Sequence, residues 1–89
     1  MNRVFKYQFE ITDKVTIQMS KGAKVISVQM QKEVPTMWAV VDDTQPMEPV
    51  KFRIFGTGHN IENIESLEFV GTIQVFGGNL VFHVFKEMS

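Results

Sequence analysis

The residues of this chain that are best suited to chemistry lie in one stretch, FRIFGTGHNI, residues 52 to 61. Gly56 and Gly58 bracket Thr57 there, directly after an apolar run that is typical of a strand. Glycines at such positions allow successive backbone N–H groups to turn toward one point, an arrangement that can receive an anion. The stretch therefore predicts either a ligand-binding loop or a turn between two strands.

Polar side chains in the same stretch would complete an anion site. Arg53 has a planar guanidinium that suits phosphate or carboxylate, Thr57 has a hydroxyl, and His59 has a ring N–H donor beside Asn60. We predict that the ligand-binding residues are Arg53, Gly56, Thr57, Gly58, His59 and Asn60. The alternative is a β-bulge or turn whose glycines only accommodate positive φ.

Trp38 is the other residue that could recognise a ligand, and we include it among the predicted ligand-binding residues. An indole stacks well on a nucleobase, at roughly 1–3 kcal/mol per base in favourable sites. Its neighbours Met37, Ala39 and Val40 are apolar, so a core anchor is the competing interpretation.

The sequence contains no recognisable catalytic motif. It has no cysteine, and none of its serines has a G-x-S-x-G context. Asp42 and Asp43 fall in a polar loop, whereas catalytic carboxylates require controlled burial. His59 and His83 lack a third ligand for a zinc site, and His83 is expected to be a half-buried, hydrogen-bonded structural residue. We expect no enzyme activity, no resident metal and no cofactor.

Composition excludes several kinds of partner. The formal net charge is -1, with nine Lys and Arg against ten Asp and Glu, scattered without runs. Duplex nucleic acid requires a basic stripe, so we expect no nucleic-acid partner. No apolar run approaches the roughly 18 residues of a membrane span, and no signal peptide is recognisable. We expect a cytoplasmic protein that folds as a single domain over residues 1–89.

Apolar and polar residues alternate along most of the chain, which is the pattern of half-buried strands. The expected strands are residues 5–11, 14–19, 26–31, 36–41, 50–55, 67–76 and 80–86. Turns are expected at residues 20–23 and 77–79, a polar surface loop at 42–49, and one helical turn capped by Asn60. Pro35 is expected outside any central ladder because it lacks an N–H. These patterns predict an all-β fold, a small antiparallel sandwich or barrel of about seven strands with little or no helix.

The last two expected strands carry apolar residues on both faces, more than one small domain can cover. Six methionines and eight phenylalanines add to this apolar load. We therefore expect a homo-oligomer, the alternative being a core closed by the first strand.

The assembled stretches resemble a small family of uncharacterised bacteriophage and bacterial proteins. The resemblance rests on residues 4–7 (VFKY), 21–29 (KGAKVISVQ), 37–42 (MWAVVD), 52–59 (FRIFGTGH), 71–74 (GTIQ) and 80–85 (LVFHVF). Members of that family often have proline after the histidine, where this chain has Asn60. The resemblance implies a compact β domain in a phage setting, acting in the host cytoplasm, and it implies no particular reaction.

We therefore expect a non-catalytic phage-type protein that captures an anionic, nucleotide-like small molecule, for example a signal of host antiviral defence. The alternative is a protein-interaction or structural module, such as a host-protein inhibitor or a virion-associated protein, that binds no small molecule. A small hydrolase acting on nucleotides ranks behind both for want of an acid/base pair.

Overall fold

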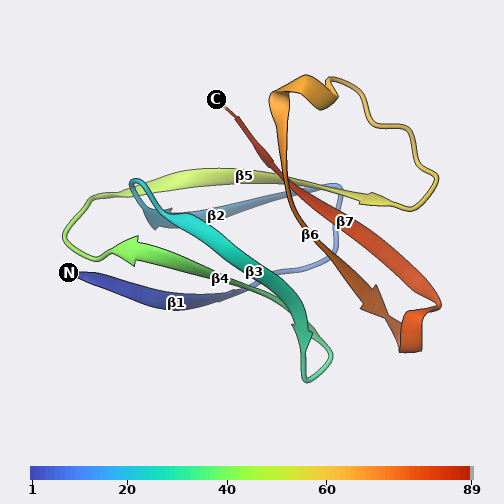
Figure 1. Ribbon diagram of the computed structural model, residues 1–89, viewed down its shortest axis with the longest axis horizontal. Coiled ribbons are helices and arrows are strands. Elements are labelled where there is room, and N and C mark those ends of the chain that lie inside the picture. The colour runs from blue at the N-terminus through green and yellow to red at the C-terminus, as the bar shows by residue number, and fades with distance from the viewer. Residues whose placement is uncertain (89) are drawn as a thin grey trace.

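The computed structural model describes residues 1–88, which form two antiparallel β-sheets packed face to face (Figure 1). The three-stranded sheet has the order β1-β4-β3, and the four-stranded sheet has the order β2-β5-β7-β6. The strands are β1 (Asn2–Gln8), β2 (Lys14–Ser20), β3 (Lys24–Gln31), β4 (Val34–Asp42), β5 (Met47–Gly56), β6 (Leu67–Val75) and β7 (Leu80–Glu87). The prediction of an all-β sandwich of about seven strands is confirmed.

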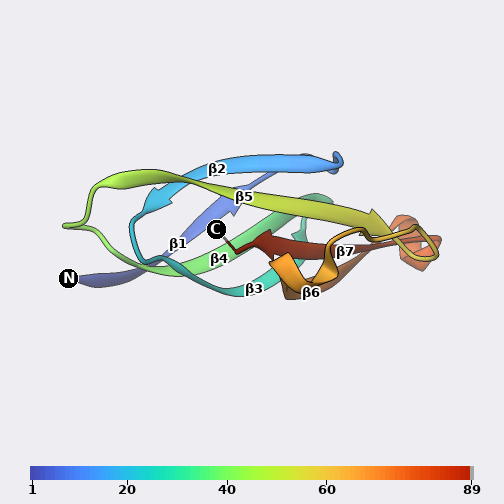
Figure 2. The ribbon, with the colours of Figure 1, turned by 90° about the horizontal axis from the view of Figure 1, so that it is seen from above.

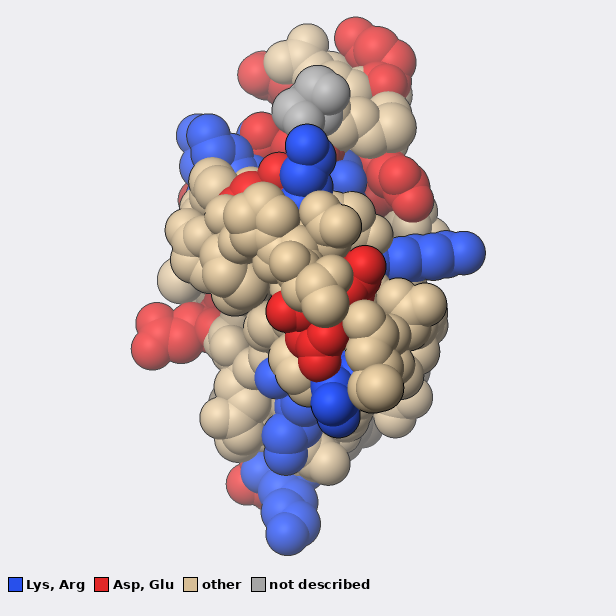
Figure 3. All heavy atoms as spheres, turned by 90° about the vertical axis from the view of Figure 1, so that its left-hand side faces the viewer, with Lys and Arg blue, Asp and Glu red and all other residues tan. Residues whose placement is uncertain are grey.

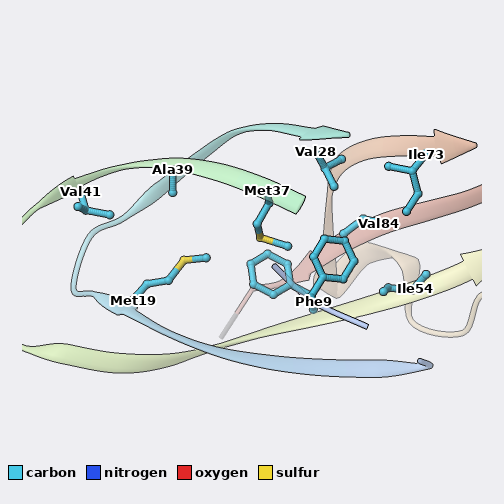
Figure 4. Packing of buried hydrophobic residues seen from close by; sticks show 10 residues of the cluster. Phe9, Met19, Val28, Met37, Ala39, Val41, Ile54, Ile73 and Val84 are labelled. Atoms are coloured by element: carbon cyan, nitrogen blue, oxygen red, sulfur yellow. The ribbon is translucent and has the colours of Figure 1, made fainter. Parts of the chain in front are cut away.

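Alternation along each strand determines which side chains fill the space between the sheets. In β4, Met37, Ala39 and Val41 are at most 1% exposed and define the inner face, so Trp38 and Val40 lie on the outer face. The core contains mostly aliphatic side chains together with two methionines and two phenylalanines (Figure 4). Its members are Phe9, Met19, Val28, Met37, Ala39, Val41, Phe52, Ile54, Ile73 and Val84. Full burial of one valine, isoleucine, phenylalanine or methionine side chain contributes about 1.5–3 kcal/mol to the stability of the fold.

The two sheets approach most closely where β3 and β6 lie side by side (Figure 2). Both strands carry an extra residue there, because the pairing register shifts between Val25 and Ser27 in β3 and between Phe69 and Gly71 in β6. A Cβ atom on Gly71 would lie 2.4 Å from Cγ1 of Val28. The bulges and the missing side chain together allow this margin of the sandwich to close.

Two expectations about proline are wrong. Pro35 lies in β4, the central strand of its sheet, where its carbonyl accepts a hydrogen bond from the N–H of Phe9 at 3.0 Å. It is tolerated because the β1–β4 ladder ends at the next pair, Gln8 and Thr36. Pro49 lies in β5 opposite Gln18, so the loop expected over residues 42–49 is shorter. Its missing N–H costs no ladder bond to β7, which pairs only with residues 52–56 of β5.

The expected helical turn is displaced along the chain. A 3₁₀ helix, η1 (Ile64–Ser66), precedes β6, and its N-cap is Asn63 in the left-handed conformation, without a side-chain cap. The prediction that Asn60 caps this turn is therefore wrong. A second 3₁₀ helix, η2 (Phe76–Gly78), forms the predicted connection between β6 and β7. Within residues 1–88, no helix is long and apolar enough to span a membrane.

Two carboxylates hold the end of the sandwich at which β1 begins: Asp42 is the last residue of β4, and Asp43 starts the turn to β5. The Thr44 hydroxyl and backbone N–H donate to Asp42 at 2.6 and 3.0 Å, and the Arg3 guanidinium donates to Asp43. Figure 3 looks onto this end and shows both signs of charge interspersed over it. The two hydrogen bonds from Thr44, followed by one from the Met1 amine, lower the pKa of Asp42 to about 2.

We expect Thr44→Val to raise the pKa of Asp42 toward the ordinary value of 3.8, because it removes the closest donor. In the native protein, the stability that Asp42 contributes is fully present above pH 3.8 and is lost as the pH falls through about 2. In the variant, the stability that Asp42 contributes should be smaller, and its loss should be complete at a higher pH. An NMR titration of the Asp42 carboxyl measures the change directly, and identical titration curves for variant and wild type would contradict it.

Candidate functional site

The outer face of the four-stranded sheet gathers basic and aromatic side chains from three neighbouring strands. The registers place Lys14 of β2 opposite Arg53 of β5, and Arg53 opposite Phe85 of β7. Lys51 lies two residues before Arg53 and therefore on the same face, while Phe69 of β6 lies opposite Phe85. We call Lys14, Lys51, Arg53, Phe69 and Phe85 the basic-aromatic face.

Arg53 is the central residue of this face. Its guanidinium carbon lies 5.4 Å from the centre of the Phe55 ring, within the range of a cation–π contact. Its Nε is buried and has no hydrogen-bond partner within residues 1–88. Ion pairs in this part of the chain join only the Met1 amine and Arg3 to Asp42 and Asp43, so the charge of Arg53 is not neutralised by a carboxylate.

The cross-strand pair of Lys14 and Arg53 places like charges directly opposite each other, which destabilises a sheet. A hollow of about 280 Å³ lies on this side of the sheet, and Lys14, Thr16, Lys51 and Glu87 are among the residues that line it. Glu87 is the single carboxylate in this lining against two lysines, and Arg53 lies next to the hollow, across from Lys14, so the surroundings favour an anion.

The aromatic part of the face is a row of three phenylalanines across β5, β7 and β6. The Phe85 ring packs edge-on against Phe55 at 5.8 Å and against Phe69 at 5.4 Å between ring centres. Phe55 is buried, whereas Phe69 is 57% exposed and offers one side to solvent. An exposed ring next to cations is suited to stacking a planar base whose phosphate contacts the basic side chains.

The Gly-Thr-Gly-His segment forms a tight turn at the end of β5. The N–H of His59 donates to the carbonyl of Gly56 at 3.1 Å, and the N–H of Thr57 donates to the carbonyl of Val81 at 3.2 Å. Two of the backbone donors expected to face an anion therefore form hydrogen bonds within the protein. Gly58 has φ of +90°, which explains its glycine, but Gly56 has a different role. A Cβ atom on Gly56 would lie 3.0 Å from Cε1 of His59, because the imidazole ring packs there.

His83 lies on the same outer face and joins two threonines. The Thr57 hydroxyl lies 2.8 Å from Nε2, and the Thr72 hydroxyl lies 3.0 Å from Nδ1. This geometry agrees with the prediction of a half-buried, hydrogen-bonded histidine. His83, on β7, links Thr57 of the turn after β5 to Thr72 of β6, so its role is to hold the turn in place.

We expect Thr57→Val to lower the free energy of unfolding by about 1 kcal/mol, because a nearly isosteric side chain removes one hydrogen bond to His83. Urea denaturation measures the change. Thr16→Val, a matched substitution at an exposed threonine of β2, is the control and should have a smaller effect. Equal effects of the two substitutions would contradict the role of this hydrogen bond.

The structure does not bring the predicted ligand-binding residues into one cluster. Arg53 and Thr57 share the outer face of the four-stranded sheet, with the buried ring of Phe55 between them along β5. His59 packs at Gly56, which alternates toward the inner face, and Asn60 is exposed beyond it. Trp38 lies on the outer face of the other sheet, on the opposite side of the sandwich.

Sequence reasoning missed the neighbours that strand pairing gives to Arg53. Lys14, Lys51, Phe69 and Phe85 come from four separate stretches, and only Lys51 is close to Arg53 in sequence. The available signal was that polar residues alternate with apolar ones in both strands. Lys14 and Thr16 flank Val15, and Lys51 and Arg53 flank Phe52. That alternation identified a solvent-facing side but not which strands lie together.

The protein is therefore a small all-β sandwich whose larger sheet carries the basic-aromatic face on its outer side. The chain belongs to the protein family described as "Domain of unknown function (DUF7352)", whose family model matches residues 1–89. The expected membership of an uncharacterised family is confirmed. No curated protein and no solved structure matches the chain.

Proposed function

We propose that the protein is a non-catalytic binding protein that captures an anionic, nucleotide-like small molecule on its basic-aromatic face. The phosphate contacts Arg53, with Lys14 and Lys51 supplying further positive charge, and the base stacks on Phe69. In the cytoplasmic phage setting that the family resemblance implies, such a protein would remove a nucleotide signal of host defence.

The observation that supports this proposal most strongly is the unneutralised state of Arg53. Its Nε is buried without a hydrogen-bond partner, and its cross-strand neighbour is another cation. Leaving a buried charged donor unpaired costs free energy, and an anion that accepts from it recovers that cost. The hollow bordered by Lys14 and Lys51 provides space for the anion beside the strand.

Isothermal titration calorimetry against a panel of cyclic nucleotides, nucleoside diphosphates and ADP-ribose tests the proposal. We expect heat of binding from at least one nucleotide, a weaker signal from inorganic phosphate, and loss of affinity as salt is raised. Chromatography of the mixture should recover the nucleotide intact. Absence of heat with every member of the panel would overturn the proposal, and a hydrolysed product would overturn its non-catalytic part.

A protein-interaction module is the second candidate, favoured by the outer face of the three-stranded sheet. Val4 is 55% exposed and Ile26 is 53% exposed there, beside the half-buried Trp38 and Val40. Such a patch can contact another protein. The substitution Ile26→Lys would abolish capture of a protein partner under this second function and leave nucleotide binding unchanged.

A further inference from the structure

The outer side chains of the four-stranded sheet form two parallel rows at the basic-aromatic face. The first row consists of residues that pair across neighbouring strands, from β6 to β2: Phe69, Phe85, Arg53 and Lys14. The second row lies two residues away along each strand, on the same face. Its members, in the same strand order, are Leu67, Glu87, Lys51 and Thr16. From β6 to β2 the chemical character of the face therefore changes from aromatic to carboxylate to cationic.

Glu87 is the member of these rows that does not suit a simple anion site. Its side chain is half-buried and lines the same hollow as Lys14 and Lys51. Within residues 1–88 it forms no ion pair with either lysine. A carboxylate repels a phosphate and can only accept hydrogen bonds, so it suits a ligand group that has hydroxyl donors. A ligand that satisfies both Glu87 and the cations has hydroxyls beside its phosphates.

We propose that the ligand is a ribonucleoside diphosphate whose two ribose hydroxyls are free, an assignment that rests on the proposed function of this face. The base stacks on Phe69, and the ribose hydroxyls donate to Glu87. The two phosphates contact Arg53 and Lys14, one on each strand. An acidic residue accepts hydrogen bonds from a ribose in the same way in dinucleotide-binding folds. The identity of the base is not selected, because every nucleobase has a face that stacks on an aromatic ring.

The strand order suits an extended ligand with two phosphates. Neighbouring strands lie about 4.8 Å apart, so Phe69 on β6 and Lys14 on β2 are about 14 Å apart across the sheet. Two cation-bearing strands, β5 and β2, follow the carboxylate and give each phosphate its own position. A cyclic nucleotide has one phosphate, and its ring closure removes a ribose hydroxyl. We therefore expect cyclic nucleotides to bind more weakly than nucleoside diphosphates or ADP-ribose.

Isothermal titration with three matched probes tests the role of Glu87. The probes are ADP, deoxy-ADP, which lacks one ribose hydroxyl, and pyrophosphate, which lacks the nucleoside. The wild type should bind ADP about threefold to tenfold more tightly than deoxy-ADP, as expected for one hydrogen bond. Glu87→Ala should bind the two nucleotides with equal affinity, but it should bind pyrophosphate more tightly than the wild type does, because a like charge is removed. Glu87→Gln retains one acceptor oxygen and should keep part of the preference for ADP.

Glu33→Ala is the matched control, because it removes the same charge from the turn between β3 and β4 of the other sheet. It should keep the wild-type preference for ADP and the wild-type affinity for pyrophosphate. An unchanged preference in Glu87→Ala, or equal wild-type affinities for ADP and deoxy-ADP, would overturn the ribose assignment and leave nucleotide capture standing. Failure of the wild type to bind any of the three probes would overturn both.

Discussion

Replacing Gly71 with alanine is expected to destabilise the protein by about 1–3 kcal/mol, the usual cost of overpacking a filled interior. The added methyl group would lie 2.4 Å from Cγ1 of Val28, far inside van der Waals contact. The clash cannot be relieved by a simple side-chain movement, because Val28 is buried between the sheets. Urea denaturation of the variant and the wild type measures the loss.

The same contact predicts strong non-additivity with Val28→Ala. That substitution removes both methyl groups of Val28 and leaves Cβ, which is 3.8 Å from the position of the new carbon. The double variant should therefore be more stable than the sum of the single effects predicts, by about 1–2 kcal/mol. Additive effects would show that β3 and β6 do not meet at this point.

Arg53→Ala is expected to weaken nucleotide binding by about 10- to 150-fold, because hydrogen bonds to charged groups contribute about 1.5–3 kcal/mol. Lys14→Ala and Lys51→Ala should cause smaller losses, since these side chains are more exposed and act as screened point charges. Isothermal titration with the tightest nucleotide of the panel measures all three.

Two further variants separate this effect from a general loss of positive charge. Lys6→Ala removes a lysine from the outer face of the opposite sheet and should leave the Kd unchanged. Arg53→Lys retains the charge but not the planar fork, so it should recover only part of the affinity. Equal losses from Arg53→Ala and Lys6→Ala would show that binding depends on net charge rather than on the basic-aromatic face.

The fold was predictable because period-two alternation extends over most of the chain and few residues compete with it. Tyr7 and Phe9, or Ile17 and Met19, lie on the side of their strands that the alternation assigns to the core. Strand bounds were less predictable where proline was involved. Pro35 and Pro49 lie inside strands because each missing N–H falls where a neighbouring strand has ended or not yet begun.

Local pattern could not reveal the bulges. The alternation from Leu67 onward assigns Phe69 and Ile73 to one side, yet the register shift after Phe69 places Phe69 outside and Ile73, which is 2% exposed, inside. A bulge depends on the approach of the other sheet at Gly71, which is a long-range contact. For the same reason, the sequence indicated that Arg53 was a candidate residue but not that Lys14 and Phe85 are its neighbours. Those neighbours follow from the order of the strands in the sheet.

The candidate loop was predicted as a unit and is divided in the structure. Thr57, which follows the last residue of β5, turns to His83, whereas the tight turn through Gly58 brings His59 back against Gly56. Within residues 1–88, Arg53 is the member of the original set that keeps a buried side-chain polar atom without a hydrogen-bond partner. The proposed binding surface consequently moves from the turn to the middle of the sheet.

A nitrogen–proton correlation NMR titration with the tightest nucleotide tests the proposed binding face most directly. We expect shifts at Lys14, Arg53 and Phe85, with the largest change at Nε of Arg53. The indole N–H of Trp38 is a unique reporter for the opposite sheet, because the chain has a single tryptophan. It should stay unchanged. Shifts centred on Trp38 and Ile26, with none at Arg53, would contradict the proposed site.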